Sequence, residues 1–220
     1  MVWTVKESNL LTAIRKGSIS EINQAIQNGA KVNAKDNDGW TPLVFACDNK
    51  ASKEVIELLI AKGAKVNAKD NDGWTPLMIA CANKAPKEVI ELLIAKGAKV
   101  NAKTNFRWTP LMFACANKAP KEVIELLIAK GAKVNAKAND GRTPLMFACA
   151  NKAPKEVIEL LKEAPFIALK ANLAKSEQEK ANLQQKIDEQ TAQIAYNNFQ
   201  AKKKEKQRMT NLMLGKYRHK

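Results

Sequence analysis

The chain has 220 residues, of which 45% are hydrophobic and 27% charged, and its formal net charge is +15. No run of about 18 apolar residues exists, which argues against a transmembrane helix, and a single histidine argues against a Cys/His zinc cluster. The excess of 37 basic over 22 acidic residues points to an acidic partner or to nucleic acid.

A unit of 34 residues recurs along the chain. A degenerate copy at 1–35 is followed by full units at 36–69, 70–103 and 104–137 and by a truncated unit at 138–165. Adjacent full units differ at only four positions. Self-similarity at this period predicts a solenoid, with the more polar residues 1–35 as its N-terminal cap.

Each unit carries the signals of two helices. In the second full unit, Gly73 supplies a turn residue, Thr75 can cap the first helix, and Pro76 suits its first position. A second helix is expected to begin around Pro86 and to end before Gly97, a C′ glycine. One such helix pair cannot bury its apolar surface alone, but stacked pairs can.

Two repeated motifs carry a resemblance to the ankyrin repeat family, in a bacterial-type variant with a 34-residue period. They are Gly-x-Thr-Pro-Leu and Gly-Ala-x-Val-Asn-Ala, and the resemblance covers residues 5–162. The family's histidine after Thr-Pro-Leu is replaced by Val44, Met78, Met112 and Met146. The resemblance implies an all-α solenoid of helix pairs with β-hairpin-like turns, and a protein–protein recognition or adaptor function.

The units offer no catalytic constellation, because histidine, Gly-x-Ser-x-Gly and P-loop motifs are absent from them. We therefore expect no enzyme, no cofactor and no metal site. Cysteines recur once per unit, at Cys47, Cys81, Cys115 and Cys149. Stacked helices lie about 8–10 Å apart, too far for disulfides, so we expect these thiols in the core of a cytoplasmic protein.

Differences between the later units concentrate at the start of each unit, in the segments that we call tip loops (36–40, 70–74, 104–108 and 138–142). The residues expected to bind a protein partner there are Trp40, Trp74, Phe106, Arg107, Trp108 and Arg142, since Trp and Arg dominate interface hot spots. By resemblance, Asp48, Asn83 and Asn117 lie beside them on a concave face. The alternative is that each tryptophan only packs against the next tip loop.

Residues 166–200 predict a helical extension, since helix formers are abundant and Gly and Pro are absent. Apolar residues near heptad spacing are Leu169, Leu173, Leu183, Ile187 and Ile194, interrupted by Ser176, Lys180 and Gln190. The expectation is a long helix or weak coiled coil, which could support a homo-oligomer. A solvated helix is the alternative.

Residues 201–220 form a basic tail with eight basic residues and one acid, a net charge of +7. The candidates for docking or for an anionic partner are Lys202, Lys203, Lys204, Lys206, Arg208, Met209, Leu212 and Met213. The tail could bind nucleic acid or another anionic surface, dock on a protein, or remain solvated. A further alternative is a structural subunit of a larger assembly.

Overall fold

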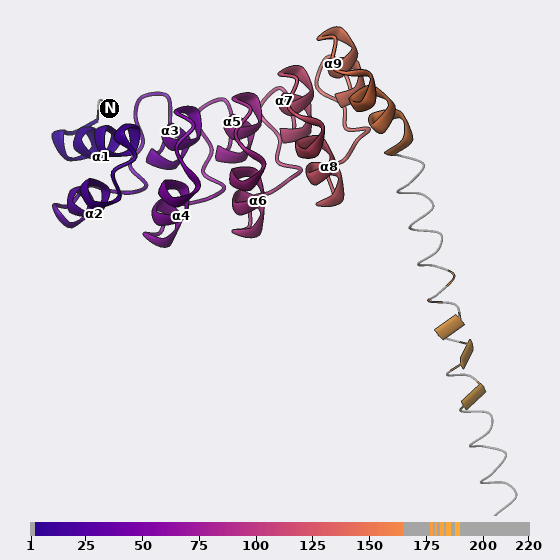
Figure 1. Cartoon of the computed structure of the whole chain (residues 1–220), viewed down its shortest axis with the longest axis horizontal. Coiled ribbons are helices and arrows are strands. Elements are labelled where there is room, and N and C mark those ends of the chain that lie inside the picture. The colour runs from indigo at the N-terminus through magenta and orange to yellow at the C-terminus, as the bar shows by residue number, and fades with distance from the viewer. Residues whose placement is uncertain are drawn as a thin grey trace, which may run out of the picture. The chain divides into compact units, whose positions relative to one another are not determined.

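The computed structural model describes residues 3–164 and eight positions beyond them: Glu177, Glu179, Ala181, Asn182, Gln184, Gln185, Asp188 and Glu189. The chain divides after Pro165 into two parts, Met1–Pro165 and Phe166–Lys220. The first part contains the stacked helices of Figure 1.

The described helices form two rows (Figure 1). The inner row contains α1 (Val5–Lys16), α3 (Pro42–Asp48), α5 (Pro76–Ala82), α7 (Pro110–Ala116) and α9 (Pro144–Ala150). The outer row contains α2 (Ile19–Gln27), α4 (Lys53–Ala61), α6 (Lys87–Ala95) and α8 (Lys121–Ala129), and residues 155–164 are also helical. Each inner helix packs on the next inner helix, and each outer helix on the next outer one.

The helices begin and end where the local chemistry predicts. Thr75 is the N-cap of α5, its hydroxyl accepts a hydrogen bond from the backbone N–H of Met78, and Pro76 is the first helical residue. Gly97 follows α6 with φ 91°, as a C′ glycine does. The tip loops are turns rather than hairpins of paired strands, since residues 3–164 contain no β-strand.

Asparagine side chains connect successive units. The Asn67 carboxamide donates to the Gly97 carbonyl and accepts from the Lys99 N–H, both at 2.8 Å, and Asn33 and Asn101 make equivalent pairs one unit earlier and later. The repeated Val-Asn-Ala motif therefore fixes the distance between neighbouring helix pairs by satisfying their backbone groups.

The core is continuous along the stack because each unit buries the same apolar positions. Leu77, Leu93 and Leu111 are completely buried, and so is Met112. The helices that carry them, α5, α6 and α7, contact helices of the neighbouring units, as expected for a solenoid whose units are stable only when stacked.

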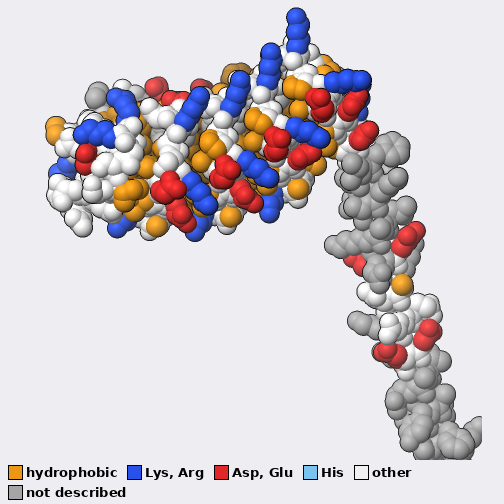
Figure 2. Space-filling model, in the orientation of Figure 1, with side chains coloured by type: hydrophobic (Ala, Val, Ile, Leu, Met, Phe, Trp, Pro, Cys, Tyr) orange, Lys and Arg blue, Asp and Glu red, His pale blue; other side chains and the backbone are white. Residues whose placement is uncertain are grey.

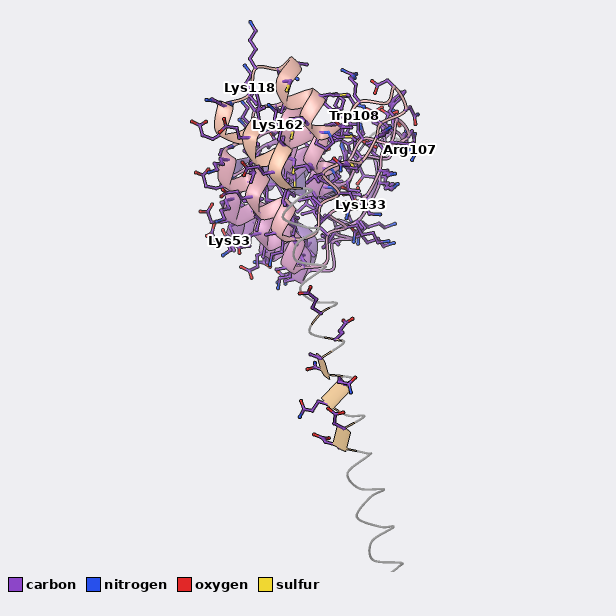
Figure 3. The ribbon with its side chains drawn as sticks, turned by 90° about the vertical axis from the view of Figure 1, so that its right-hand side faces the viewer. Lys53, Arg107, Trp108, Lys118, Lys133 and Lys162 are labelled. Atoms are coloured by element: carbon purple, nitrogen blue, oxygen red, sulfur yellow. The ribbon has the colours of Figure 1, made fainter. Side chains whose placement is uncertain are left out.

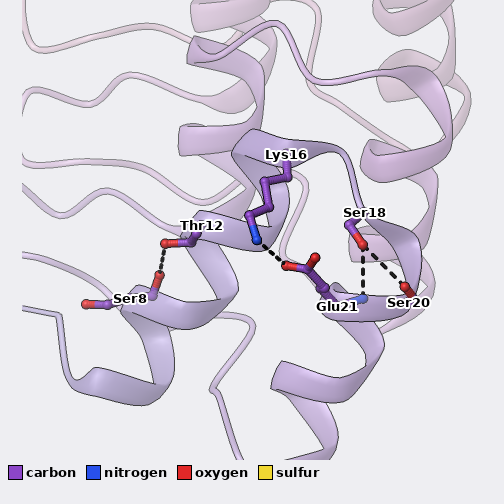
Figure 4. Close-up of polar contacts among 6 residues, drawn as sticks. All are labelled: Ser8, Thr12, Lys16, Ser18, Ser20 and Glu21. Atoms are coloured by element: carbon purple, nitrogen blue, oxygen red, sulfur yellow. Dashed lines mark hydrogen bonds and ion pairs between the residues drawn. The ribbon is translucent and has the colours of Figure 1, made fainter.

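The N-terminal helix pair carries polar contacts at its surface (Figure 4). Lys16 forms an ion pair with Glu21 at 3.0 Å, and the Ser18 hydroxyl caps α2 by accepting from the Glu21 N–H. Such groups tolerate water, which suits a terminal unit.

The C-terminal unit leaves core positions open. Met146 is 53% exposed, whereas the equivalent Met112 is buried, and Cys149 is exposed, whereas Cys47, Cys81 and Cys115 are buried. The expectation of four core cysteines is thus right for three and wrong for Cys149. Among the described residues, no further unit packs on α9 to cover it.

No described helix has the length and hydropathy required to cross a membrane. The described positions between 177 and 189 have helical backbone, and Gln184 and Gln185 each donate to the acid four residues later. The heptad positions named above lie outside the described residues, so the predicted coiled coil stays a prediction.

Candidate recognition groove

A groove of about 790 Å³ lies between the tip loops and the inner helices of three successive units. Its lining residues are Asp72, Trp74, Ala82, Asn83, Thr104, Phe106, Trp108, Phe113, Ala116, Asn117, Asn139, Asp140 and Arg142. Figure 3 shows Trp108 and Arg107 on one side of the stack and Lys53, which begins the outer helix α4, on the other. The groove therefore belongs to the inner, tip-loop side of the solenoid.

In the first three tip loops the side chain of the first residue closes the loop, whereas in the fourth Asp140 accepts from the Arg142 N–H. The Asp70 carboxylate accepts from the backbone N–H of Trp74 at 2.7 Å and of Asp72 at 3.0 Å. Burial raises the pKa of Asp70, although these hydrogen bonds act in the opposite direction. In the next unit, the Thr104 hydroxyl accepts from the Trp108 N–H at 3.1 Å, so that the loop keeps its form without the charge.

The aromatic rings along the groove form a continuous chain. The ring centroid of Trp74 lies 4.1 Å from that of Phe113, and Trp108 lies 5.1 Å from Phe113 and 4.3 Å from Phe147. Both tryptophans are only partly buried, whereas Phe113 and Phe147 belong to the core. The inner-helix phenylalanines thus hold each tryptophan in place and leave part of its indole accessible.

Arg142 ends this aromatic chain. Its guanidinium lies 4.5 Å from the centroid of Phe147 and 5.8 Å from that of Trp108, within the range of cation–π attraction. It also forms an ion pair with Asp140 at 2.6 Å, and the hydrogen bond from Arg142 lowers the pKa of that carboxyl group. The positive charge of Arg142 is therefore already matched within its own tip loop.

Phe106 and Arg107 form the most unusual tip loop. Phe106 is 63% exposed, and Arg107 has φ 62°, where the equivalent Gly39, Gly73 and Gly141 have φ between 79° and 83°. A left-handed conformation is costly for a residue with a Cβ. The loop therefore places an aromatic and a cationic side chain in solvent at the expense of backbone strain.

The structure brings together six of the nine residues expected to bind a protein partner. Those that line the groove are Trp74, Asn83, Phe106, Trp108, Asn117 and Arg142. Trp40, Asp48 and Arg107 do not line it, although Asp48 accepts a hydrogen bond from the Asn83 side chain at 3.0 Å. The tail residues Lys202 to Met213 lie outside the described part of the chain.

Sequence reasoning missed the two phenylalanines that support the tryptophans. Phe113 stands where the preceding unit has Ile79, and this is one of the four differences between those two units. That difference could have indicated Phe113 as part of the site. The contact between Trp74 and Phe113 joins residues of neighbouring units, so it depends on how the units stack.

A search of curated proteins returned no match to this chain. A family model for ankyrin repeats (3 copies) matches residues 10–104 and 85–172, which together cover well over half of the sequence. This match agrees with the stacked helix pairs and the repeated caps described above. The chain belongs to the ankyrin repeat family.

Proposed function

We propose that this protein is a non-catalytic recognition module that binds a protein partner in the groove between Trp74 and Arg142. Ankyrin repeats generally mediate protein–protein interaction. The observation that carries the proposal is the accessible aromatic lining of one groove by Trp74, Phe106 and Trp108. Exposed aromatic side chains on a rigid support are typical anchors of an interface.

The pattern of substitution between units supports this location. The repeats are otherwise almost identical, yet the loop at Phe106 and Arg107 departs from its neighbours and adopts a strained backbone. An exposed aromatic and cationic pair that replaces the Asp-Gly turn and contributes nothing to the core suggests a role in binding. The described cysteines are free thiols, which is consistent with a reducing cytoplasmic environment.

The proposal can be tested by removing one exposed side chain. The tagged full-length protein and its Phe106→Ser variant are used to isolate interacting proteins from the native source, with Val5→Ser as the matched control. Val5 is 77% exposed on α1 and does not line the groove, so both substitutions remove a solvent-facing apolar side chain. We expect a protein that is retained by wild type and by Val5→Ser but lost with Phe106→Ser. Identical recovery by all three forms would contradict the proposal.

A second candidate function is binding to nucleic acid or another anionic surface. It is favoured by eleven lysines in the loops that follow the outer helices: Lys31, Lys35, Lys62, Lys65, Lys69, Lys96, Lys99, Lys103, Lys130, Lys133 and Lys137. All but Lys103 are exposed, and none forms an ion pair with a residue in 3–164. Figure 2 shows basic side chains mixed with acidic ones on the face that it presents. The basic tail would add to this charge.

A further inference from the structure

We propose that the groove takes a basic side chain, Lys or Arg, of the partner, held between the aromatic rings and the carboxylate of Asp72. This inference rests on the proposed function, because it names the chemistry of the partner at the same site. It concerns the part of the groove between Asp72, Trp74, Phe106 and Trp108.

The first argument is the charge of the groove. Its ionisable lining residues are Asp72, Asp140 and Arg142, and the last two neutralise each other in an ion pair. The Asp72 carboxylate has no hydrogen-bond or ion-pair partner among residues 3–164. The lining therefore carries one unmatched negative charge on a protein whose net charge is +15.

The second argument is the aromatic surface beside that charge. Trp74, Phe106 and Trp108 supply three aromatic rings, and Phe106 is 63% exposed. The faces of such rings attract cations, and their apolar area accepts the methylene stem of a lysine or arginine. An acidic side chain would meet the negative faces of the rings and the charge of Asp72.

The third argument is an arrangement that the chain itself forms two units after Asp72. There, the cation of Arg142 lies over Trp108 and Phe147 and is bound by Asp140. Asp72 occupies the same unit position as Asp140, but the residue two positions later is Trp74 instead of an arginine. The groove beside Asp72 thus has an acid and aromatic rings, from Trp74 and from Phe106 and Trp108 of the next unit, but no unpaired cation, which a partner would supply.

The repeat also provides a matched control. Asp38 occupies the same position as Asp72 one unit earlier, is likewise exposed, and does not line the groove. Asp72→Asn and Asp38→Asn therefore remove the same charge from equivalent loops, and only the first removes it from the groove.

The experiment uses a random peptide library displayed on phage, selected on the full-length protein. Selected peptides are resynthesised with a fluorescent label and titrated against wild type, Phe106→Ser, Asp72→Asn and Asp38→Asn. We expect peptides that need Phe106 to carry a Lys or Arg whose replacement by norleucine weakens binding. We also expect Asp72→Asn to weaken them about three- to fivefold, as for one exposed charge pair, and Asp38→Asn to leave Kd unchanged.

The outcomes separate this inference from the proposed function. Peptides that need Phe106 but lack a basic residue, or that bind Asp72→Asn and wild type equally, would overturn the inference and leave the recognition groove standing. Selected acidic peptides that need Phe106 would overturn it in the same way. If no selected peptide needed Phe106, both proposals would be wrong.

Discussion

Single residues of this protein can be compared with their own copies in other units, which separates the effect of side-chain type from that of environment. Cys115 and Cys149 occupy the same unit position, yet the first is buried and the second exposed. Arg107 and Gly141 likewise share a position and a left-handed backbone. The two cysteines have the same local sequence, so their difference in exposure reports the position in the stack. Arg107 and Gly141 differ in side chain on a similar backbone, so a difference between them reports side-chain type.

The thiols test burial directly. Burial raises the pKa of Cys47 and Cys115 to about 12 and raises that of Cys81 further, so few of these thiols are ionised near neutral pH. We expect one thiol per chain to react quickly with Ellman's reagent in native protein, and all four after denaturation. The Cys149→Ser variant should lose the fast reaction. Rapid reaction of several thiols in that variant would contradict the burial described here.

The backbone at Arg107 predicts a gain in stability on substitution. Arg107→Gly removes a Cβ from a left-handed residue and should raise the free energy of unfolding by about 0.5–1 kcal/mol. Gly141→Ala should lower it by a similar amount, since Gly141 has φ 79° and a Cβ there would meet no atom within 4 Å. Urea unfolding curves of the two variants measure both effects. A destabilised Arg107→Gly would show that the side chain contributes more to folding than its exposure indicates.

At the scale of helices, the contribution of each element depends on its neighbours. The inner helices α5 and α7 are covered on both sides, whereas α9 has α7 on one side and no other described inner helix on the other. Identical core residues therefore contribute unequally to stability along the stack.

This inequality can be measured with one substitution at two sites. Met112→Ala creates a cavity in a fully buried position and should cost about 2–5 kcal/mol. Met146→Ala, at a position that is 53% exposed, should change the free energy of unfolding by no more than about 0.5 kcal/mol. Equal losses in denaturant unfolding would mean that α9 is covered in solution.

Much of the fold could be predicted from sequence because its signals are local and repeated. The Thr75 cap, the Pro76 start and the glycine after α6 are each determined by a few neighbouring residues. The exposure of Cys149 could not be read in this way, because its unit resembles the others and only its position in the stack differs.

The sequence indicated which residues form the candidate site better than it indicated what each of them does there. The substitutions in the tip loops indicated Trp74, Phe106 and Trp108, which the structure places along one groove. Arg142 was expected to bind a partner as an interface residue, but its charge is paired with Asp140 of the same tip loop. The supporting contacts of Phe113 and Phe147 depend on the register between units, which repeat identity alone does not reveal.

For the whole molecule, the excess charge defines the second candidate function. If residues 201–220 bind nucleic acid through five phosphate contacts, affinity should fall by roughly two to three orders of magnitude over a fourfold rise in salt. RNA and DNA titrations of the full-length protein and of a chain ending at Phe199 measure this. Tight, strongly salt-dependent binding that is lost on truncation would favour nucleic acid over a protein as the ligand of this chain. Weak binding by both forms would contradict the nucleic-acid function of the tail.

The central claim, that a partner binds in the groove, is tested most directly by the four tryptophans. Trp74 and Trp108 line the groove, whereas Trp3 and Trp40 lie outside it. Selective ¹⁵N labelling of tryptophan gives one indole N–H signal from each, observable by NMR while the isolated partner is added. We expect the signals of Trp74 and Trp108 to shift or broaden with saturation and those of Trp3 and Trp40 to stay in place. Partner binding that leaves the Trp74 and Trp108 signals unchanged would contradict the account.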